Sequence, residues 1–250
     1  MKYNLRIFET PYALSVAAAN LIIKLADKSI KARGKFVISL SGGNSPEKLY
    51  SLLATPDFND KMPWKNIFIF WGDERCVSLV DPQNNAHMAK SLLLDRVGIP
   101  PSNIYPVPVN LLPSEAAAQY NQTIKQFFGD DEPRFDLMLL GLGENGHTAS
   151  LFPGTKVLLE KEPGVKEEFI DELKMFRITM TAPLINKARN IVFLVSGKAK
   201  AEIVYTMFTV PYQPDTYPAQ MIKPENGELL WMVDNAAAAL LPEDIKEKAQ

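Results

Sequence analysis

The chain has 250 residues, 46% of them hydrophobic and 22% charged, with a formal net charge of −2 at pH 7. This composition is typical of a globular protein, for which we expect one domain over residues 1–250, and the small net charge excludes a protein-wide attraction to nucleic acid or an anionic membrane. One cysteine and two histidines exclude a disulfide framework and a typical structural zinc site, and no apolar run approaches the roughly 20 residues of a membrane span, so we expect a cytoplasmic protein without a metal.

Short apolar runs of strand length alternate with segments of helical spacing along most of the chain. The runs lie at residues 5–8, 36–40, 67–71, 137–140, 176–180, 191–195 and 229–233. The helical segments lie at residues 12–31, 46–54, 85–97, 114–128 and 198–208. Strands that are apolar on both faces and alternate with helices are typical of a covered parallel sheet. The sequence therefore predicts an α/β fold with a mainly parallel, Rossmann-like sheet and helices on both faces.

Other segments have less regular patterns. Residues 156–172 are charged and irregular, which predicts a solvated excursion, with a mobile flap as the alternative. The four alanines at 236–239 predict a short packed helix capped by Asp234 or Asn235. The proline-rich residues 100–113 and 211–224 are expected to form ordered surface loops.

A glycine turn follows the second apolar run and precedes a helix. The turn consists of Ser41, Gly42, Gly43 and Asn44. Ser45 is the expected N-cap, and Pro46 lies in the first helical turn. Such a turn exposes backbone N–H groups at the positive end of a helix dipole and can hold an anion. The spacing of a P-loop is absent, and an ordinary strand–turn–helix is an equally good interpretation.

Charged residues follow the third apolar run, at the edge where open α/β sheets bind ligands. We expect Asp73 to orient a substrate or carry a proton, and Arg75 to clamp a phosphate. A mutual ion pair among Asp73, Glu74 and Arg75 is the competing interpretation. Cys76 has no neighbouring base and is interpreted as structural.

The most informative segment is residues 136–154. An apolar run leads into Gly141, Gly143 and Gly146, and His147 follows directly. Glycines permit positive φ and close approach of a ligand, and a neutral imidazole suits general-base catalysis. A simple turn with an incidental histidine is the weaker alternative. The glycine spacing also matches a dinucleotide fingerprint, but Pro153 ends any helix early, so we expect no nicotinamide or flavin cofactor.

Two later segments add polar groups. Arg177, Thr179 and Thr181 alternate along a strand, so they share a face and need a polar partner such as substrate. A strand–glycine–helix junction places Lys198 and Lys200 in the first helical turn. Because cations are unfavourable at a helix N-terminus, these lysines favour an anionic ligand, although an exposed lysine pair is the simpler alternative.

In this order the motifs resemble those of the 6-phosphogluconolactonases over nearly the whole chain. The matching segments are residues 41–46, 71–75, 141–154, 177–181, 197–200, 218–219 and 231–237. The resemblance implies the fold shared with glucosamine-6-phosphate deaminases and ribose-5-phosphate isomerases. It also implies hydrolysis of 6-phospho-D-glucono-1,5-lactone in the oxidative pentose phosphate pathway without a metal or cofactor.

On this template His147 is the catalytic base, and Asn145 and Asp73 complete the catalytic group. The implied phosphate and sugar contacts are Ser41, Gly42, Gly43, Asn44, Arg75, Gly143, Gly146, Arg177 and Lys200. Many relatives look like Gly-x-Asp-Gly-His here, whereas this chain has Asn145, an amide that can orient a ring but cannot accept a proton. We expect His147 to deprotonate a water that attacks C1, and amides of the glycine loop to bind the oxyanion.

Three other functions remain open. A glucosamine-6-phosphate deaminase shares the fold but needs more acid–base groups. A serine hydrolase would use Ser41, which lacks the first glycine of the Gly-x-Ser-x-Gly elbow. A sugar-phosphate sensor would bind without turnover. For the lactonase we expect a sugar-phosphate lactone as the partner, no nucleic acid or membrane, and a monomer or weak homo-oligomer.

Overall fold

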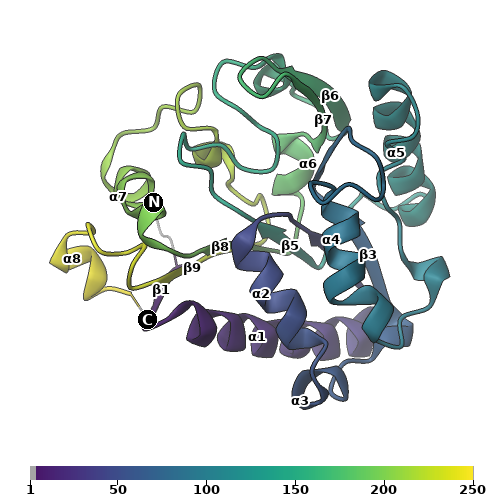
Figure 1. Cartoon of the computed structure of the whole chain (residues 1–250), viewed down its shortest axis with the longest axis horizontal. Helices are drawn as coiled ribbons and strands as arrows, with labels where there is room; N and C mark the ends of the chain where they lie inside the picture. The colour runs from purple at the N-terminus through teal and green to yellow at the C-terminus, as the bar shows by residue number, and fades with distance from the viewer. Residues whose placement is uncertain (1–3, 250) are drawn as a thin grey trace.

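Parallel strands form the central sheet of the computed structural model, which describes residues 4–249 (Figure 1). Within that range the six strands of this sheet are, in spatial order, β1 (Asn4–Phe8), β9 (Glu228–Asp234), β8 (Asn190–Val195), β5 (Leu137–Leu140), β2 (Phe36–Leu40) and β3 (Ile67–Trp71). Every neighbouring pair is parallel. The central strands are buried along their whole length because helices flank the sheet. The predicted α/β fold is confirmed.

A second, antiparallel sheet has the order β4 (Asp73–Arg75), β7 (Met175–Met180), β6 (Val165–Ile170). The strand predicted at 176–180 forms, but it belongs to this sheet and not to the parallel one. The prediction of a solvated excursion at 156–172 is wrong, since the segment contains β6. Lys166 is exposed and Glu167 and Glu168 are partly exposed, and pairing with β7 makes this segment a strand although its apolar content is too low to predict one.

Gly72 joins the two sheets. Its N–H donates to the carbonyl of Leu40 at 3.1 Å, and its carbonyl accepts from the N–H of Met180 at 2.8 Å. The chain therefore passes from β3 directly into β4. This single-residue link carries Asp73 and Arg75 out of the parallel sheet and onto the smaller one.

The helices are α1 (Pro11–Arg33), α2 (Asn44–Leu53), α3 (Pro56–Asn59), α4 (Asn85–Leu92), α5 (Pro113–Phe128), α6 (Ala182–Asn186), α7 (Ala201–Thr209) and α8 (Glu243–Lys246). Figure 1 shows α1 along the lower side of the molecule with α2 packed on it, and α5 beside β6 and β7. None of the helices within residues 4–249 is long and apolar enough to cross a membrane.

The ends of α1 follow from its sequence. Thr10 caps the N-terminus by accepting a hydrogen bond from the N–H of Ala13 at 3.1 Å, and Pro11 occupies the first turn. Gly34 ends the helix in the left-handed conformation, with φ of 73°. Lys31 and Arg33 lie in the last turn, where the helix dipole favours cations.

Two predicted helix boundaries are wrong. Helix α2 begins at Asn44 with Gly43 as its cap, because the Ser45 hydroxyl bonds to Ser196 at 2.7 Å instead of capping. The helix predicted at 85–97 ends at Leu92, and a 3₁₀ turn follows at Leu94–Arg96.

The four alanines at 236–239 form a turn and not a helix. Asp234 nevertheless caps it as predicted, since its carboxylate accepts from the N–H of Ala237 at 2.8 Å. The same carboxylate accepts from the N–H of Gly197 at 3.0 Å, which ties the end of β9 to the turn after β8. A local helix signal is thereby overridden by a tertiary contact.

Candidate active site

A cleft of about 580 Å³ opens at the carboxyl ends of β2, β5 and β8. Strands β2 and β5 are neighbours, but the chain continues from β2 to β3 on one side and from β5 to β8 on the other. Open α/β sheets bind their ligands at such a switch point. Strands β4 and β7 add Asp73, Arg75 and Arg177 to the lining.

The turn after β2 is held in place by Tyr50 of α2. The buried Tyr50 hydroxyl donates to the carbonyl of Ser41 at 2.8 Å and accepts from the N–H of Ser41 at 3.1 Å. Burial raises the pKa of Tyr50, so the hydroxyl keeps its proton for the first of these bonds. Gly43 adopts φ of 102°, a conformation that favours glycine, and directs the turn into α2. The residues from Ser41 to Asn44 all line the cleft.

The side chains of Glu74 and Arg75 form no ion pair in the described structure, although the Glu74 carboxylate accepts from the backbone N–H of Arg75 at 2.8 Å. The Glu74 carboxylate accepts from the N–H groups of Asn85 at 2.7 Å and Ala86 at 2.8 Å, so it caps α4. Burial raises the pKa of Glu74 to about 7, against the opposing effect of these N–H donors. The Arg75 guanidinium instead bonds to the carbonyl of Gln83 at 2.5 Å and lines the cleft. The mutual ion pair weighed from the sequence is therefore not formed in the described structure.

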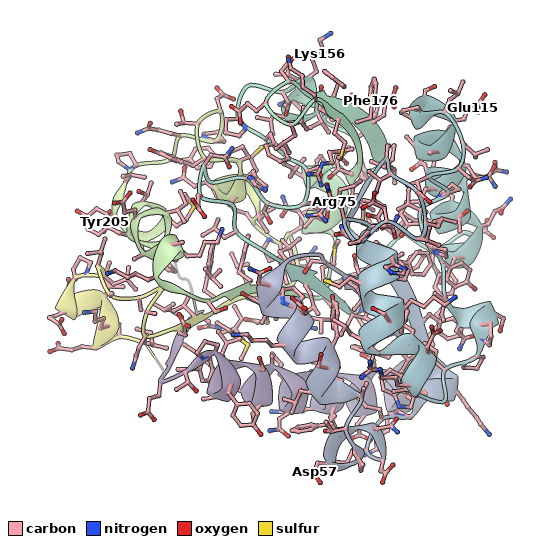
Figure 2. The ribbon with its side chains drawn as sticks, in the orientation of Figure 1. Asp57, Arg75, Glu115, Lys156, Phe176 and Tyr205 are labelled. Carbon is pink, nitrogen blue, oxygen red and sulfur yellow. The ribbon has the colours of Figure 1, made fainter. Side chains whose placement is uncertain are left out.

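Arg75 and Arg177 are cross-strand partners on β4 and β7. In Figure 2 Arg75 lies toward the middle of the molecule, while Phe176 lies near the edge, as expected for the outward face of β7. Both Nε atoms are buried and have no hydrogen-bond partner among residues 4–249. Burial lowers the pKa of Arg177, opposed by the charge of Asp73. The two guanidinium groups thus offer the cleft unused donors for an oxygen-rich anion.

Backbone amides of the glycine loop, residues 141–147, form hydrogen bonds within the loop. The N–H of Gly143 donates to the carbonyl of His147 at 2.8 Å, and the N–H of Gly146 donates to the carbonyl of Gly143 at 3.0 Å. A Cβ on Gly143 would overlap the His147 ring, so the ring lies directly on the backbone. Gly146, with φ of 80°, is packed against Tyr217 and does not line the cleft. These two amides are therefore engaged in the loop.

Asn145 fixes the tautomer of His147. Its side-chain oxygen accepts from the backbone N–H of His147 at 3.2 Å and lies 2.5 Å from Nδ1 of the same residue. Because the backbone group can only donate, the atom of Asn145 that faces Nδ1 is the oxygen, and Nδ1 must carry the proton. Nε2 is then the unprotonated nitrogen. The ring also stacks on Phe152, with 4.0 Å between the centroids.

The electrostatic environment keeps His147 neutral. Burial lowers the pKa of His147 to about 4, and the positive charges of Lys200, Arg177 and Arg75 act in the same direction. The negative charge of Asp73 opposes them. The imidazole is consequently a free base at neutral pH.

Lys200 reaches the cleft from the start of α7. It lies 3.9 Å from the exposed carboxylate of Glu144, and burial lowers its pKa. The predicted junction of strand, glycine and helix is present, with a 3₁₀ turn at Lys198–Lys200 before α7.

Eleven of the twelve site residues predicted from the sequence line this cleft. They are Ser41, Gly42, Gly43, Asn44, Asp73, Arg75, Gly143, Asn145, His147, Arg177 and Lys200, and Gly146 is outside it. Of the three polar residues predicted to alternate on one strand, Thr181 lies just after β7. Thr179 and Thr181 have protein partners instead of a ligand: Thr179 accepts from the N–H of Ser150, and Thr181 caps α6.

Sequence reasoning missed two groups of the lining. Glu172 and Leu173 reach the cleft from the turn between β6 and β7, a segment for which no strand was predicted. Asn85 also lines the cleft: its amide donates to the carbonyl of Asp73 at 3.0 Å, and its side chain fills the space beside Gly42. Within residues 4–249 no cluster of three or more histidine, cysteine or acidic side chains is arranged to hold a metal ion.

The fold and the cleft define an α/β protein with a basic, histidine-containing site suited to a small anionic molecule. A family model described as glucosamine-6-phosphate isomerases/6-phosphogluconolactonase matches residues 9–231. The chain belongs to this family.

Similar proteins cover nearly the whole chain. A 6-phosphogluconolactonase of Nostoc sp. is 39% identical over 245 residues, which are 96% of this chain and 99% of that protein. The 6-phosphogluconolactonase of Synechocystis sp. is 44% identical over 214 residues, 84% of this chain and 86% of that protein. The crystal structure of 6-phosphogluconolactonase from Trypanosoma cruzi has a TM-score of 0.83 at 27% identity and covers 96% of this chain and 97% of its own. A monomeric glucosamine-6-phosphate deaminase, at 24% identity and a TM-score of 0.81, shares the fold.

Proposed function

We propose that this chain hydrolyses 6-phospho-D-glucono-1,5-lactone to 6-phospho-D-gluconate, a step of the oxidative pentose phosphate pathway, with His147 as the general base. The relatives named 6-phosphogluconolactonase support the reaction, since they match over most of the chain. The single observation that carries the role of His147 is its contact of 2.5 Å with Asn145, which leaves Nε2 free to accept a proton.

The phosphate binds where helices α2 and α7 begin at the cleft. The N-terminus of α2 presents the Ser41–Asn44 turn to the cleft, and Lys200 stands at the start of α7. Backbone N–H groups at a helix N-terminus and a lysine ammonium both favour a phosphate. Anchoring the phosphate here fixes the orientation of the lactone ring.

Hydrolysis then requires two proton transfers, one to His147 and one from it. Water attacks C1 of the lactone while Nε2 of His147 takes its proton, and the imidazolium returns a proton to the departing ring oxygen. The oxyanion needs donors that are not already used. The amides of Gly143 and Gly146 are engaged within the loop, so the guanidinium groups of Arg75 and Arg177, which line the cleft, are the better donors.

The geometry favours water over serine as the nucleophile. The Ser41 hydroxyl is buried, and it has no hydrogen-bond partner in the part of the chain that the structure describes. A catalytic serine needs a base within hydrogen-bond reach. No such base is bonded to the Ser41 hydroxyl, whereas Nε2 of His147 can accept a proton from a water bound in the cleft.

The test is a coupled assay on freshly generated lactone, read against its uncatalysed hydrolysis. His147→Ala is expected to lower kcat by about 100-fold or more while 6-phosphogluconate binding persists. The matched control is His87→Ala, since His87 lies on α4 away from the cleft lining and its loss leaves turnover unchanged.

Three results would contradict the proposal. Release of ammonia from glucosamine 6-phosphate without lactone hydrolysis would identify a deaminase. Labelling of Ser41 by a covalent serine probe would identify a serine hydrolase. Tight binding of phosphosugars with no turnover would identify a sensor. A cytoplasmic location, one domain over residues 1–250 and a monomer or weak homo-oligomer are part of the proposal, and light scattering tests the last of these.

A further inference from the structure

Ser150 contacts two strands of the smaller sheet at once. Its hydroxyl donates to the carboxylate of Asp73 at 2.6 Å, and its backbone N–H donates to the hydroxyl of Thr179 at 3.2 Å. Asp73 and Thr179 are cross-strand partners on β4 and β7. Ser150 and Thr179 are wholly buried, and Asp73 is 8% exposed. The loop that carries His147 is thus fastened to this sheet through Ser150.

The backbone beside Ser150 needs such support. Ala149 has φ of 49°, in the left-handed region that a residue with a Cβ rarely adopts. A conformation of this kind persists only where surrounding contacts hold it. The two hydrogen bonds of Ser150 are adjacent to Ala149, and the ring of His147 lies two residues before it.

Asp73 is the negatively charged residue that acts on His147 in this chain, because the side chain of Asn145 is neutral. When His147 accepts a proton, the amide of Asn145 cannot balance the new positive charge. The charge of Asp73 acts on His147 in the direction that stabilises the imidazolium. Asp73 and His147 line the same cleft, so the position of the Asp73 carboxylate affects how well it stabilises the imidazolium, and the hydrogen bond from the Ser150 hydroxyl holds that carboxylate in place.

We propose that Ser150 is a positioning residue for lactone hydrolysis, which acts by holding the Asp73 carboxylate in its place in the cleft. This inference rests on the proposed function. It assigns to Ser150 an effect on turnover that passes through Asp73, and not merely a part in the packing of the loop.

The experiment is a double-mutant cycle on kcat and KM of the whole chain. Ser150→Ala is expected to lower kcat about tenfold with KM changed less than about twofold, because it removes a buried hydrogen bond to a charged group. In an Asp73→Asn background the same substitution is expected to have almost no further effect. If the alanine variant does not fold, Ser150→Cys, whose thiol is a weak donor, carries the same expectation.

Thr148→Val is the matched control. Thr148 is also wholly buried in this loop, and its hydroxyl donates to the carbonyl of Gly141 at 2.8 Å, with no contact to Asp73. Its effect on kcat should be equal in the wild-type and Asp73→Asn backgrounds. If Ser150→Ala proves equally additive, or leaves kcat unchanged, Ser150 is only a packing residue and the inference is overturned. A wild-type chain that does not hydrolyse the lactone overturns the proposed function and this inference together.

Discussion

At the scale of single residues, the reactivity of His147 depends on one amide. Asn145 holds Nδ1 as a donor at 2.5 Å, which orients the ring and selects the tautomer. It contributes no charge, so nothing on that side of the ring offsets the burial and the cations that lower the pKa of His147 to about 4. The base is therefore neutral but weak.

Asn145→Asp should make the base stronger. A carboxylate beside Nδ1 stabilises the imidazolium, so we expect the pKa of His147 to rise from about 4 toward its ordinary value. We also expect kcat at pH 8 to increase by up to about tenfold. The acid limb of the pH–kcat profile should move to higher pH, because the base is then protonated earlier on acidification. NMR titration of the ring, assigned with His87→Gln, measures the pKa directly.

The same residue has an effect on stability with a defined sign. The pKa of His147 is about 4 in the folded state and near 6.5 in an unfolded chain, so the unfolded state binds more protons between these values. His147 therefore lowers the free energy of unfolding as pH falls from about 6.5 toward 4, and has no such effect above that window. Urea unfolding of the wild type and of His147→Gln at pH 7 and pH 5 measures this contribution. If the two proteins differ in their free energy of unfolding by the same amount at both pH values, the prediction is contradicted.

At the scale of elements, two buried tyrosines hold the ends of strands where the cleft begins. Tyr50 bonds to both backbone groups of Ser41 after β2, and Tyr120 of α5 accepts from the N–H of Trp71 at 2.8 Å and donates to its carbonyl at 3.1 Å. Both strand ends would otherwise leave buried backbone groups without partners. Each helix therefore stabilises the strand end that delivers functional residues.

Tyr120→Phe tests this arrangement. Loss of the hydroxyl leaves the N–H and carbonyl of Trp71 unpaired in the core, so we expect the free energy of unfolding to fall by about 1–3 kcal/mol. Tyr105→Phe is the control, because Tyr105 stacks on Phe70 at 4.6 Å and its hydroxyl has no hydrogen-bond partner within residues 4–249. Urea unfolding of both variants gives the comparison, and equal losses would show that the strand-end bonds are unimportant.

At the scale of the whole molecule, the catalytic edge and the opposite edge of the sheet have different roles. Asp136 stands at the start of β5, where its carboxylate contacts Arg33 at 2.6 Å and Arg189 at 3.4 Å. It also accepts from the N–H of Val37 at 2.9 Å. One buried carboxylate thus joins the starts of β2, β5 and β8, far along the strands from the cleft.

Asp136→Asn should therefore affect stability without affecting catalysis. We expect the free energy of unfolding to fall by about 2 kcal/mol, less than for a fully buried pair because both arginines are partly exposed. The kcat of the folded protein should not change. Glu243→Gln, which alters an exposed pair with Lys246, is the control and should not measurably change stability. A large drop in kcat for Asp136→Asn would contradict this separation of roles.

Local patterns in the sequence were sufficient to predict the parallel sheet and the polar turns that follow its strands, and the resemblance to the 6-phosphogluconolactonases implied the set of site residues. Apolar runs predict strands because a covered parallel strand is apolar on both faces, and polar residues just after those runs meet at one edge. The resemblance implied one site for residues as distant as Asn44, His147 and Lys200, and all three line the cleft.

Only the tertiary structure decided how these residues are connected. Four features depend on contacts between different segments of the chain. They are the pairing of β6, the capping of α4 by Glu74, the hydrogen bond from Ser150 to Asp73 and the packing of Gly146 on Tyr217. A local sequence pattern does not predict such pairings, because it reflects only the preference of each residue for a buried position or for a turn. The sequence by itself determined the strands of the parallel sheet and the polar turns at their ends, whereas long-range pairing and hydrogen bonds decided which groups reach the cleft and which of them remain free to meet a ligand.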